Sequence, residues 1–167
     1  MATLAKNINW NAYNYFDALI KKNKLAQEKG FKTFLCSGLD GFNEALQAYQ
    51  KTTSFVCVSD TSDGSIELNN SPHSRRVKTI FLARRHKVDD MSARETAMDT
   101  LRELFRQLMS RFLKEKNRLE NNHLYINSQI RFKEISRYFY NGCACAYFLI
   151  TLDTYTNLME NGDEWDD

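Results

Sequence analysis

The sequence predicts an α+β fold, with a single, mostly antiparallel β-sheet and a long amphipathic helix packed on one of its faces. Three observations predict this fold. Apolar residues recur at helical spacing over residues 92–118, which indicates the long helix. Segments rich in β-branched and aromatic residues indicate strands both before and after that helix in the sequence. One proline and six glycines suggest few tight turns and long elements. We expect one domain over residues 1–159 and an acidic, mobile tail over 160–167.

The first half of the chain begins with a predicted helix over residues 10–29. Asn9 is the expected N-cap, and Gly30 is the expected stop. In chain order, the next predicted elements are a strand at 31–36, a short helix at 40–50, a strand at 54–59, a polar segment at 60–74 and a strand with a buried centre at 80–83. The polar segment reads as either a long loop or an extended hairpin.

The long helix is the most strongly patterned element. Ser92 and Glu95 match a capping box at its start. Its apolar stripe consists of Ala97, Met98, Leu101, Leu104, Phe105, Leu108, Met109, Phe112 and Leu113.

Two strands are expected to close the chain. The first lies in "QIRFKEISRYFY", where imperfect alternation suggests a bulge. Asn141–Gly142 is a favoured two-residue hairpin turn, and a strand from Cys143 to Tyr155 follows it. Both faces of that strand are largely apolar, so it is expected to be central or covered on both sides. Small residues at the start of this strand leave room for another element to pack closely against it, and the long helix is the first candidate for that element.

Composition bounds the class of protein. The chain is 43% hydrophobic and 26% charged, which is ordinary for a soluble protein. Its apolar runs are far shorter than the ~20 residues that a membrane helix needs. The N-terminus lacks the apolar core of a signal peptide. We therefore expect a cytosolic protein without membrane contact, whose cysteines are reduced.

The pair Cys143 and Cys145 raises three alternatives, namely a metal site, a redox pair and simple packing. On a strand the two side chains share a face about 6.6 to 6.8 Å apart, which is too far for a comfortable disulfide. A zinc site would need two more ligands, and Cys36 and Cys57 lie on other predicted strands. The favoured interpretation is small, buried thiols packed under a helix.

Catalytic motifs do not stand out. His73, His86 and His123 have no carboxylate or cysteine at a telling spacing, and there is no nucleophile elbow or glycine-rich phosphate loop. The sequence therefore predicts no enzyme, no catalytic residues, no metal ligands and no cofactor, although an unrecognised site stays an alternative.

Charge is distributed unevenly along the chain. Between residues 75 and 87 there are six Lys or Arg and no acid, whereas after Arg137 there are six acids and no Lys or Arg. The candidate interface or phosphate-contact residues are Arg75, Arg76, Lys78, Arg84, Arg85 and Lys87. They could follow nucleic-acid phosphates, meet a protein partner, or form a solvated strand edge that prevents edge pairing.

The order of the elements is similar to that of the tail-terminator and tail-completion proteins of long-tailed bacteriophages. The matching stretches are "SFVCVS", the segment 60–74, "VKTIFLAR", the helix 92–118 and "IRFKEISRYFYNGCACAYFLITL". With the first helix they cover about two thirds of the chain. The short helix at 40–50 and the length of the long helix depart from the simplest pattern of that family.

The resemblance implies a structural subunit of a phage or prophage without enzyme activity. Such proteins form homo-oligomeric rings, commonly hexamers, at the head–tail junction and contact other tail or neck proteins. The implied location is the cytoplasm during assembly and then the virion. The basic segment and the acidic C-terminal stretch could meet between subunits, or the basic segment could line a channel and contact DNA transiently. The alternative function is a small nucleic-acid-binding module that uses residues 75–87.

Overall fold

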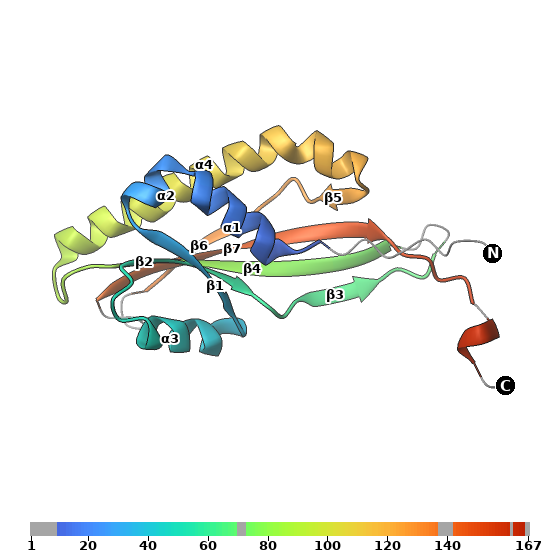
Figure 1. The fold of residues 1–167 in the computed structure, drawn as a ribbon, viewed down its shortest axis with the longest axis horizontal. Helices are drawn as coiled ribbons and strands as arrows, with labels where there is room; N and C mark the ends of the chain where they lie inside the picture. Colours follow the sequence, from blue (N-terminus) through green and yellow to red (C-terminus); the bar gives the residue numbers. More distant parts are fainter. Residues whose placement is uncertain (1–9, 70–72, 137–141, 161, 166–167) are drawn as a thin grey trace.

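The computed structural model describes residues 10–69, 73–136, 142–160 and 162–165. These residues form an α+β structure in which helices cover both faces of one seven-stranded sheet (Figure 1). The sheet is mostly antiparallel, as predicted. Within the described residues, the pair of β1 and β2 is the one parallel exception.

The sheet follows the order β1-β2-β4-β7-β5, with β3 also paired to β4 and β6 also paired to β7. In chain order the elements are α1 (Ala12–Lys22), α2 (Lys24–Glu28), β1 (Phe31–Cys36), α3 (Gly38–Ala48), β2 (Ser54–Ser59), β3 (Asp63–Ile66), β4 (His73–Arg85), α4 (Met91–Asn121), β5 (Leu124–Ile126), β6 (Phe132–Ile135), β7 (Cys143–Tyr155) and the 3-10 turn η1 (Gly162–Glu164). The predicted bounds of β1, β2 and β7 are confirmed.

The prediction of one continuous helix over residues 10–29 is wrong. The helix breaks at Asn23, which adopts an extended conformation with φ −82° and ψ 122°. Its side-chain oxygen then accepts a hydrogen bond from the backbone nitrogen of Ala26 at 2.8 Å and caps α2. Asparagine favours this cap conformation over a helix interior, so one residue ends α1 and starts α2.

The N-cap of α1 is Asn11, whose side chain accepts from the backbone nitrogen of Asn14 at 2.9 Å. The predicted cap, Asn9, lies outside the described residues. Gly30 follows α2 with a φ of 70°, as expected for a glycine that ends a helix.

α4 extends one residue before and three residues beyond its predicted bounds. Its N-cap is Asp90, whose carboxylate accepts from the backbone nitrogen of Ala93 at 2.9 Å, so the predicted capping box of Ser92 and Glu95 is wrong. The Asp90 carboxylate already caps the first turn, and Glu95 pairs instead with Arg102 at 2.7 Å. α3 lies two residues earlier than the predicted helix at 40–50.

Within the described part of the polar segment at 60–74, β3 pairs with β4 from Asp63↔Val77 to Ile66↔Ser74, which confirms the extended hairpin over the long loop. Residues 70–72 of this segment lie outside the described residues. The strand predicted over "RRVKTIFLARRHKV" corresponds to β4, which begins two residues earlier and ends at Arg85, and its predicted centre at 80–83 is buried. β4 is thereby long enough to pair with both β2 and β3 on one side.

The closing strands differ from the prediction in register. Ile135 pairs with Cys145, whereas a two-residue turn at 141–142 would pair Ile135 with Phe148. Asn141 itself lies outside the described residues, as do residues 137–140 of the predicted strand. The three-residue strand β5 is an element that the sequence did not indicate; it pairs with the end of β7.

Two apolar layers hold the sheet, one on each face. Under α1, α2 and α4, the Phe148 ring is fully buried and lies 5.8 Å from Phe16 and 5.2 Å from Phe105, between ring centroids. Ala144 and Ala146 face this layer. On the opposite face, α3 brings Phe42 into a stack with Phe81 at 4.7 Å. β7 is therefore central and covered on both faces along its first half, as predicted.

The buried stripe of α4 yields a paired test of this packing. Leu104 is fully buried, whereas Leu113, which the predicted stripe included, is 72% exposed. We expect Leu104→Ala to lower the free energy of unfolding by about 2–5 kcal/mol. Leu113→Ala should change it by less than ~0.5 kcal/mol, because the helix propensities are similar and no cavity forms. Urea unfolding measures both, and equal losses would contradict the assigned orientation of α4.

Candidate functional site

The sheet is longer than the helix on one of its faces. β4 and β7 have 13 residues each and pair from His73↔Tyr155 to Arg85↔Cys143, which gives a length of about 43 Å. α4, with 31 residues, is about 46 Å long and matches the sheet on one face. α3, with 11 residues, spans only about 16 Å of the other face. On the α3 side, no described helix covers the distal part of the sheet (Figure 1).

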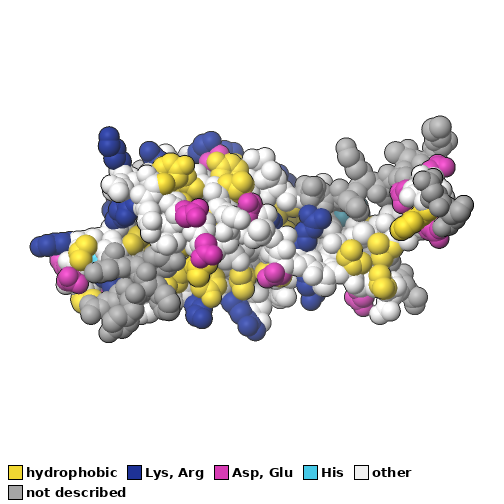
Figure 2. Space-filling view, turned by 90° about the horizontal axis from the view of Figure 1, so that it is seen from below, with side chains coloured by type: hydrophobic (Ala, Val, Ile, Leu, Met, Phe, Trp, Pro, Cys, Tyr) yellow, Lys and Arg dark blue, Asp and Glu magenta, His cyan; other side chains and the backbone are white. Residues whose placement is uncertain are grey.

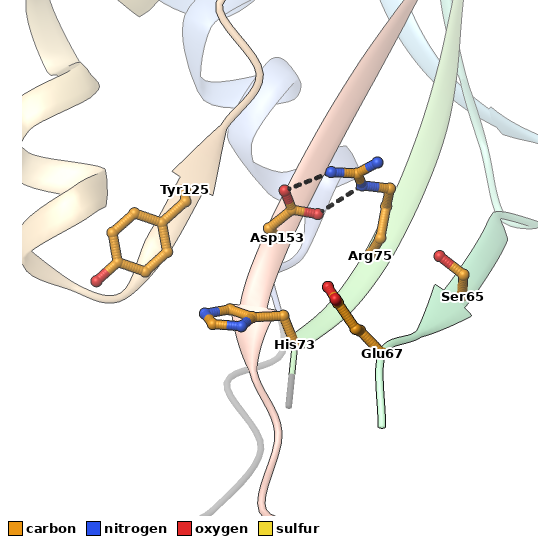
Figure 3. Close-up of a pocket in the computed structure, with 6 residues that line it drawn as sticks. All are labelled: Ser65, Glu67, His73, Arg75, Tyr125 and Asp153. Atoms are coloured by element: carbon orange, nitrogen blue, oxygen red, sulfur yellow. Dashed lines mark hydrogen bonds and ion pairs between the residues drawn. The ribbon is translucent and has the colours of Figure 1, made fainter. Parts of the chain in front are cut away.

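We call this distal part the arm. It consists of β3 with residues 67–68 that follow it, β5, residues 73–78 of β4 and residues 150–155 of β7. Its open face holds a pocket of about 380 Å³ (Figure 3). The pocket is lined by Ser65, Glu67, His73, Arg75, Tyr125 and Asp153. All six side chains come from arm strands or from the residue that follows β3, so the antiparallel register alone positions them.

An ion pair lies at the centre of this pocket. Arg75 and Asp153 are direct cross-strand neighbours, and two hydrogen bonds join them, from Nε to Oδ1 at 2.8 Å and from Nη2 to Oδ2 at 3.0 Å. The hydrogen bonds and charge of Arg75 hold the pKa of Asp153 below its usual range, although partial burial acts in the opposite direction. The pair links neighbouring side chains of β4 and β7. The guanidinium of Arg75 is therefore already hydrogen-bonded to a carboxylate.

Large apolar and aromatic side chains are exposed on the arm. Strand alternation places Tyr125 and Tyr155 on the same face as the ion pair, and Ile66 on the opposite face. Ile66 is 51% exposed and Leu68 is 83% exposed, while Tyr125 and Tyr155 are 43% and 49% exposed. Tyr155 also packs edge-to-face on His73, with 6.4 Å between ring centroids. Figure 2 views the α3 side of the molecule and shows hydrophobic side chains at the protruding end as well as around α3. Grouped exposure of this kind is typical of an interaction surface.

The open edge of β3 adds backbone groups to the same surface. β3 pairs with β4 on one side, and all four of its residues are exposed. No described strand pairs with its other edge. An unpaired edge offers N–H and C=O groups to another chain. The arm can therefore bind a partner through an exposed sheet face, an open edge and a polar pocket.

The predicted basic segment is divided between the two faces of the sheet. Arg75 and Arg85 lie on the α3 side of the sheet. Arg76, Lys78 and Arg84 lie on the α4 side, together with Ile80 and Leu82. The six cations therefore do not form one continuous stripe. This division follows from strand alternation, so the sequence already carried the signal.

Several of these cations bind the protein's own backbone. Arg84 donates from Nη1 to the carbonyl oxygen of Lys29 at 2.9 Å and to Oγ of Ser54 at 2.7 Å. Lys78 donates from Nζ to the carbonyl oxygens of Ser59, Asp60 and Thr61, at 3.3, 3.0 and 3.3 Å. Arg84 thus ties β4 to the start of β1 and β2, and Lys78 ties it to the connection between β2 and β3.

Arg85 holds the C-terminal end of α3 against the sheet. It donates to the carbonyl oxygens of Thr52 at 2.9 Å, Leu46, and Tyr49 at 3.4 Å. Its guanidinium also lies over the ring of Phe55, 5.2 Å from the centroid. Leu46 lies in the last turn of α3, where carbonyl groups lack a partner within the helix, so this arginine supplies a donor at the helix end. Of the remaining candidates, Arg76 and Lys87 are exposed at the surface.

The cysteines pack as predicted. All four are free and buried, and they share the layer beneath α3. Burial raises the pKa of the Cys145 thiol, which keeps it protonated. Among the described residues, no group of three or more His, Cys, Asp or Glu side chains is placed to hold a metal ion.

Of the six residues that line the pocket of the arm, Arg75 is the one that was predicted as a site residue from the sequence. A signal for Asp153 was present, because it is the only acid between Arg137 and Glu160 and interrupts an apolar strand. Comparison with protein-family models and with curated proteins found no match to this chain. None of the helices in the described ranges combines the length and apolarity needed to cross a membrane.

Arg85 and Lys87 form a matched pair for testing the structural use of the basic segment. We expect Arg85→Met to lower the free energy of unfolding by about 1.5–3 kcal/mol, because it leaves carbonyl groups at the end of α3 without a donor. Lys87→Met, at an exposed position, should change it by less than ~0.5 kcal/mol. Urea unfolding followed by circular dichroism separates the two. An Arg85 variant as stable as the wild type would contradict the structural role.

The ion pair of the arm predicts a pH dependence. The pKa of Asp153 is lowered in the folded state, so its stabilisation is present above the unfolded pKa of about 3.9 and is lost as the pH falls through the lower folded value. Because the pair is largely exposed to solvent, its contribution to stability should be small. We expect Arg75→Gln to raise the pKa of Asp153 towards 3.9. Carbon NMR of the carboxyl group measures it, and an unchanged titration would contradict the pairing.

Proposed function

We propose that this protein is a structural subunit of a phage or prophage, of the tail-terminator or neck type, which acts by assembling into a ring at the head–tail junction. The observation that carries the proposal is the arm, a sheet extension with an uncovered face, exposed apolar side chains and an open strand edge. The order of elements, which resembles that family, supports the same function. The open edge of β3 and the exposed apolar side chains of the arm favour a protein as the binding partner.

The shape of the subunit supports a ring. The arm extends from one end of the molecule, and helices cover both faces of the sheet at the other end (Figure 1). A ring needs a heterologous interface, in which one patch meets a different patch on the neighbour. The projecting arm and the helix-covered body offer two different patches of this kind. A hexamer is the stoichiometry that the resemblance implies.

The alternative function, nucleic-acid binding through residues 75–87, draws less support from the geometry. Arg84, Arg85 and Lys78 donate to groups of the protein itself. Arg75 is matched by a carboxylate. Four of the six cations are thus held in interactions within the protein, and the other two, Arg76 and Lys87, lie near opposite ends of the segment. A transient contact with DNA inside a ring stays a secondary proposal.

Solution mass tests the proposal. We expect the wild-type chain, measured by light scattering at several concentrations, to form an oligomer of its 19.5 kDa subunit that appears as a ring by electron microscopy. In the arm variant Leu68→Lys, we expect assembly to weaken at least about tenfold, equivalent to 1.4 kcal/mol, because the change places a charge in an apolar contact.

Leu113→Lys is the matched control, since it adds the same charge at another exposed leucine outside the arm. It should leave assembly unchanged, and both variants should unfold like the wild type. A wild-type chain that stays monomeric at every concentration, with no rings in the micrographs, would contradict the proposed function. Equal weakening by both variants would remove the arm from the interface.

A further inference from the structure

The two ends of the molecule differ in charge. One end carries the exposed or half-exposed lysines Lys29, Lys32, Lys51 and Lys87, which we call the lysine end. Hydrogen bonds bring these segments together: Ser54 Oγ donates to the carbonyl oxygen of Lys29 at 2.8 Å, and the backbone nitrogen of Arg85 donates to the carbonyl oxygen of Thr53 at 2.8 Å. Lys32 lies beside them, opposite Phe55 on β2.

The opposite end carries the C-terminal segment, residues 157–165. It follows β7 at the tip of the arm, and the chain leaves the body there (Figure 1). The segment contains no Lys or Arg. Its acids, Glu160, Asp163 and Glu164, are exposed. It also exposes three large apolar side chains, Leu158 at 43%, Met159 at 79% and Trp165 at 64%.

The lysine end has apolar surface to match. Tyr49, at the end of α3, is 49% exposed, and Val88, in the connection from β4 to α4, is 54% exposed. These side chains lie close to Lys51 and Lys87 in the sequence. Three acids lie in the same segments, namely Asp89, Asp90 and Glu28, which pairs with Lys29 at 2.8 Å. Counting Arg84 and Arg85, the cations of the lysine end still outnumber these acids. Both ends therefore combine exposed apolar groups with net charge, and the net charges have opposite signs.

We propose that the C-terminal segment of one copy docks on the lysine end of the next copy. The contact joins Glu160 and Glu164 to Lys51 and Lys87, with Trp165, Leu158 and Met159 against Tyr49, Val88 and the lysine stems. Because the two patches lie at opposite ends of the long axis, the contact is heterologous and repeats from copy to copy. This inference rests on the proposed assembly and names the partner as a second copy of this chain.

The occupant follows from charge and position. On the arm itself, Arg75 already pairs with Asp153, and Lys78 already donates to backbone carbonyl groups. The C-terminal segment carries acids and no Lys or Arg, so it complements the lysine end at the far end of an identical molecule. The lysine end could also attract nucleic acid, but its exposed apolar groups favour a segment that carries apolar side chains. The test below separates these two partners.

A charge swap tests the contact. The tail variant carries Glu160→Lys and Glu164→Lys, and the end variant carries Lys51→Glu and Lys87→Glu. We expect each variant alone to assemble at least about tenfold more weakly than the wild type. An equimolar mixture should recover assembly, since each tail then meets an end of opposite charge. A chain with all four substitutions should assemble on its own.

The control chain carries Glu44→Lys and Lys114→Glu, two exposed positions outside both patches, and should assemble like the wild type. If the wild type assembles and the single-patch variants do too, the inference is overturned while the proposed function stands. A mixture that does not recover assembly overturns it as well. A monomeric wild type overturns both. Loss of duplex-DNA retention by the end variant, with assembly intact, would assign the lysine end to nucleic acid instead.

Discussion

The pairing of β4 with β7 over thirteen residues is the interaction on which the rest of the structure depends. It joins residues 58 to 82 positions apart in the sequence, from Arg85↔Cys143 under α3 to His73↔Tyr155 at the tip of the arm. Every other strand except β1 pairs directly with β4 or β7 among the described residues. Both buried layers form on its two faces, and the Arg75–Asp153 pair spans it. The register of this ladder therefore decides which side chains meet.

The unequal helix lengths on the two faces leave one end of this ladder uncovered on the α3 side. A helix of about 46 Å supports the sheet along one face, so the arm keeps its shape without a helix of equal length opposite. The uncovered face then presents Tyr125 and Tyr155 to solvent. Natural proteins usually cover such a face or place charge on it. Covering by a neighbouring subunit is the account we propose, with the C-terminal segment extending the same contact.

Sequence patterns predicted the elements with strong periodicity and missed those set by tertiary contacts. The bounds of β7, which is apolar on both faces, were predicted to the residue. α4, whose apolar stripe is continuous, was predicted to within three residues at each end. β5 is too short to carry a pattern. The cap of α4 was assigned to Ser92 because Ser92 and Glu95 match a capping box. Asp90, two residues earlier, is an equally suitable cap residue and is the one that the structure uses. Arg85 looked like a surface cation because its carbonyl partners lie 33 to 39 residues away. The arm depends on strand pairing, which no local pattern shows.

Hydrogen–deuterium exchange of the assembled protein against a dilute sample tests the central claim most directly, because it reports where assembly covers the chain. The account predicts slower exchange on assembly at the edge strand β3 and in the C-terminal segment, with unchanged exchange along the buried middle of α4. Assembly that leaves β3 and residues 157–165 exchanging as fast as in the dilute sample would contradict it.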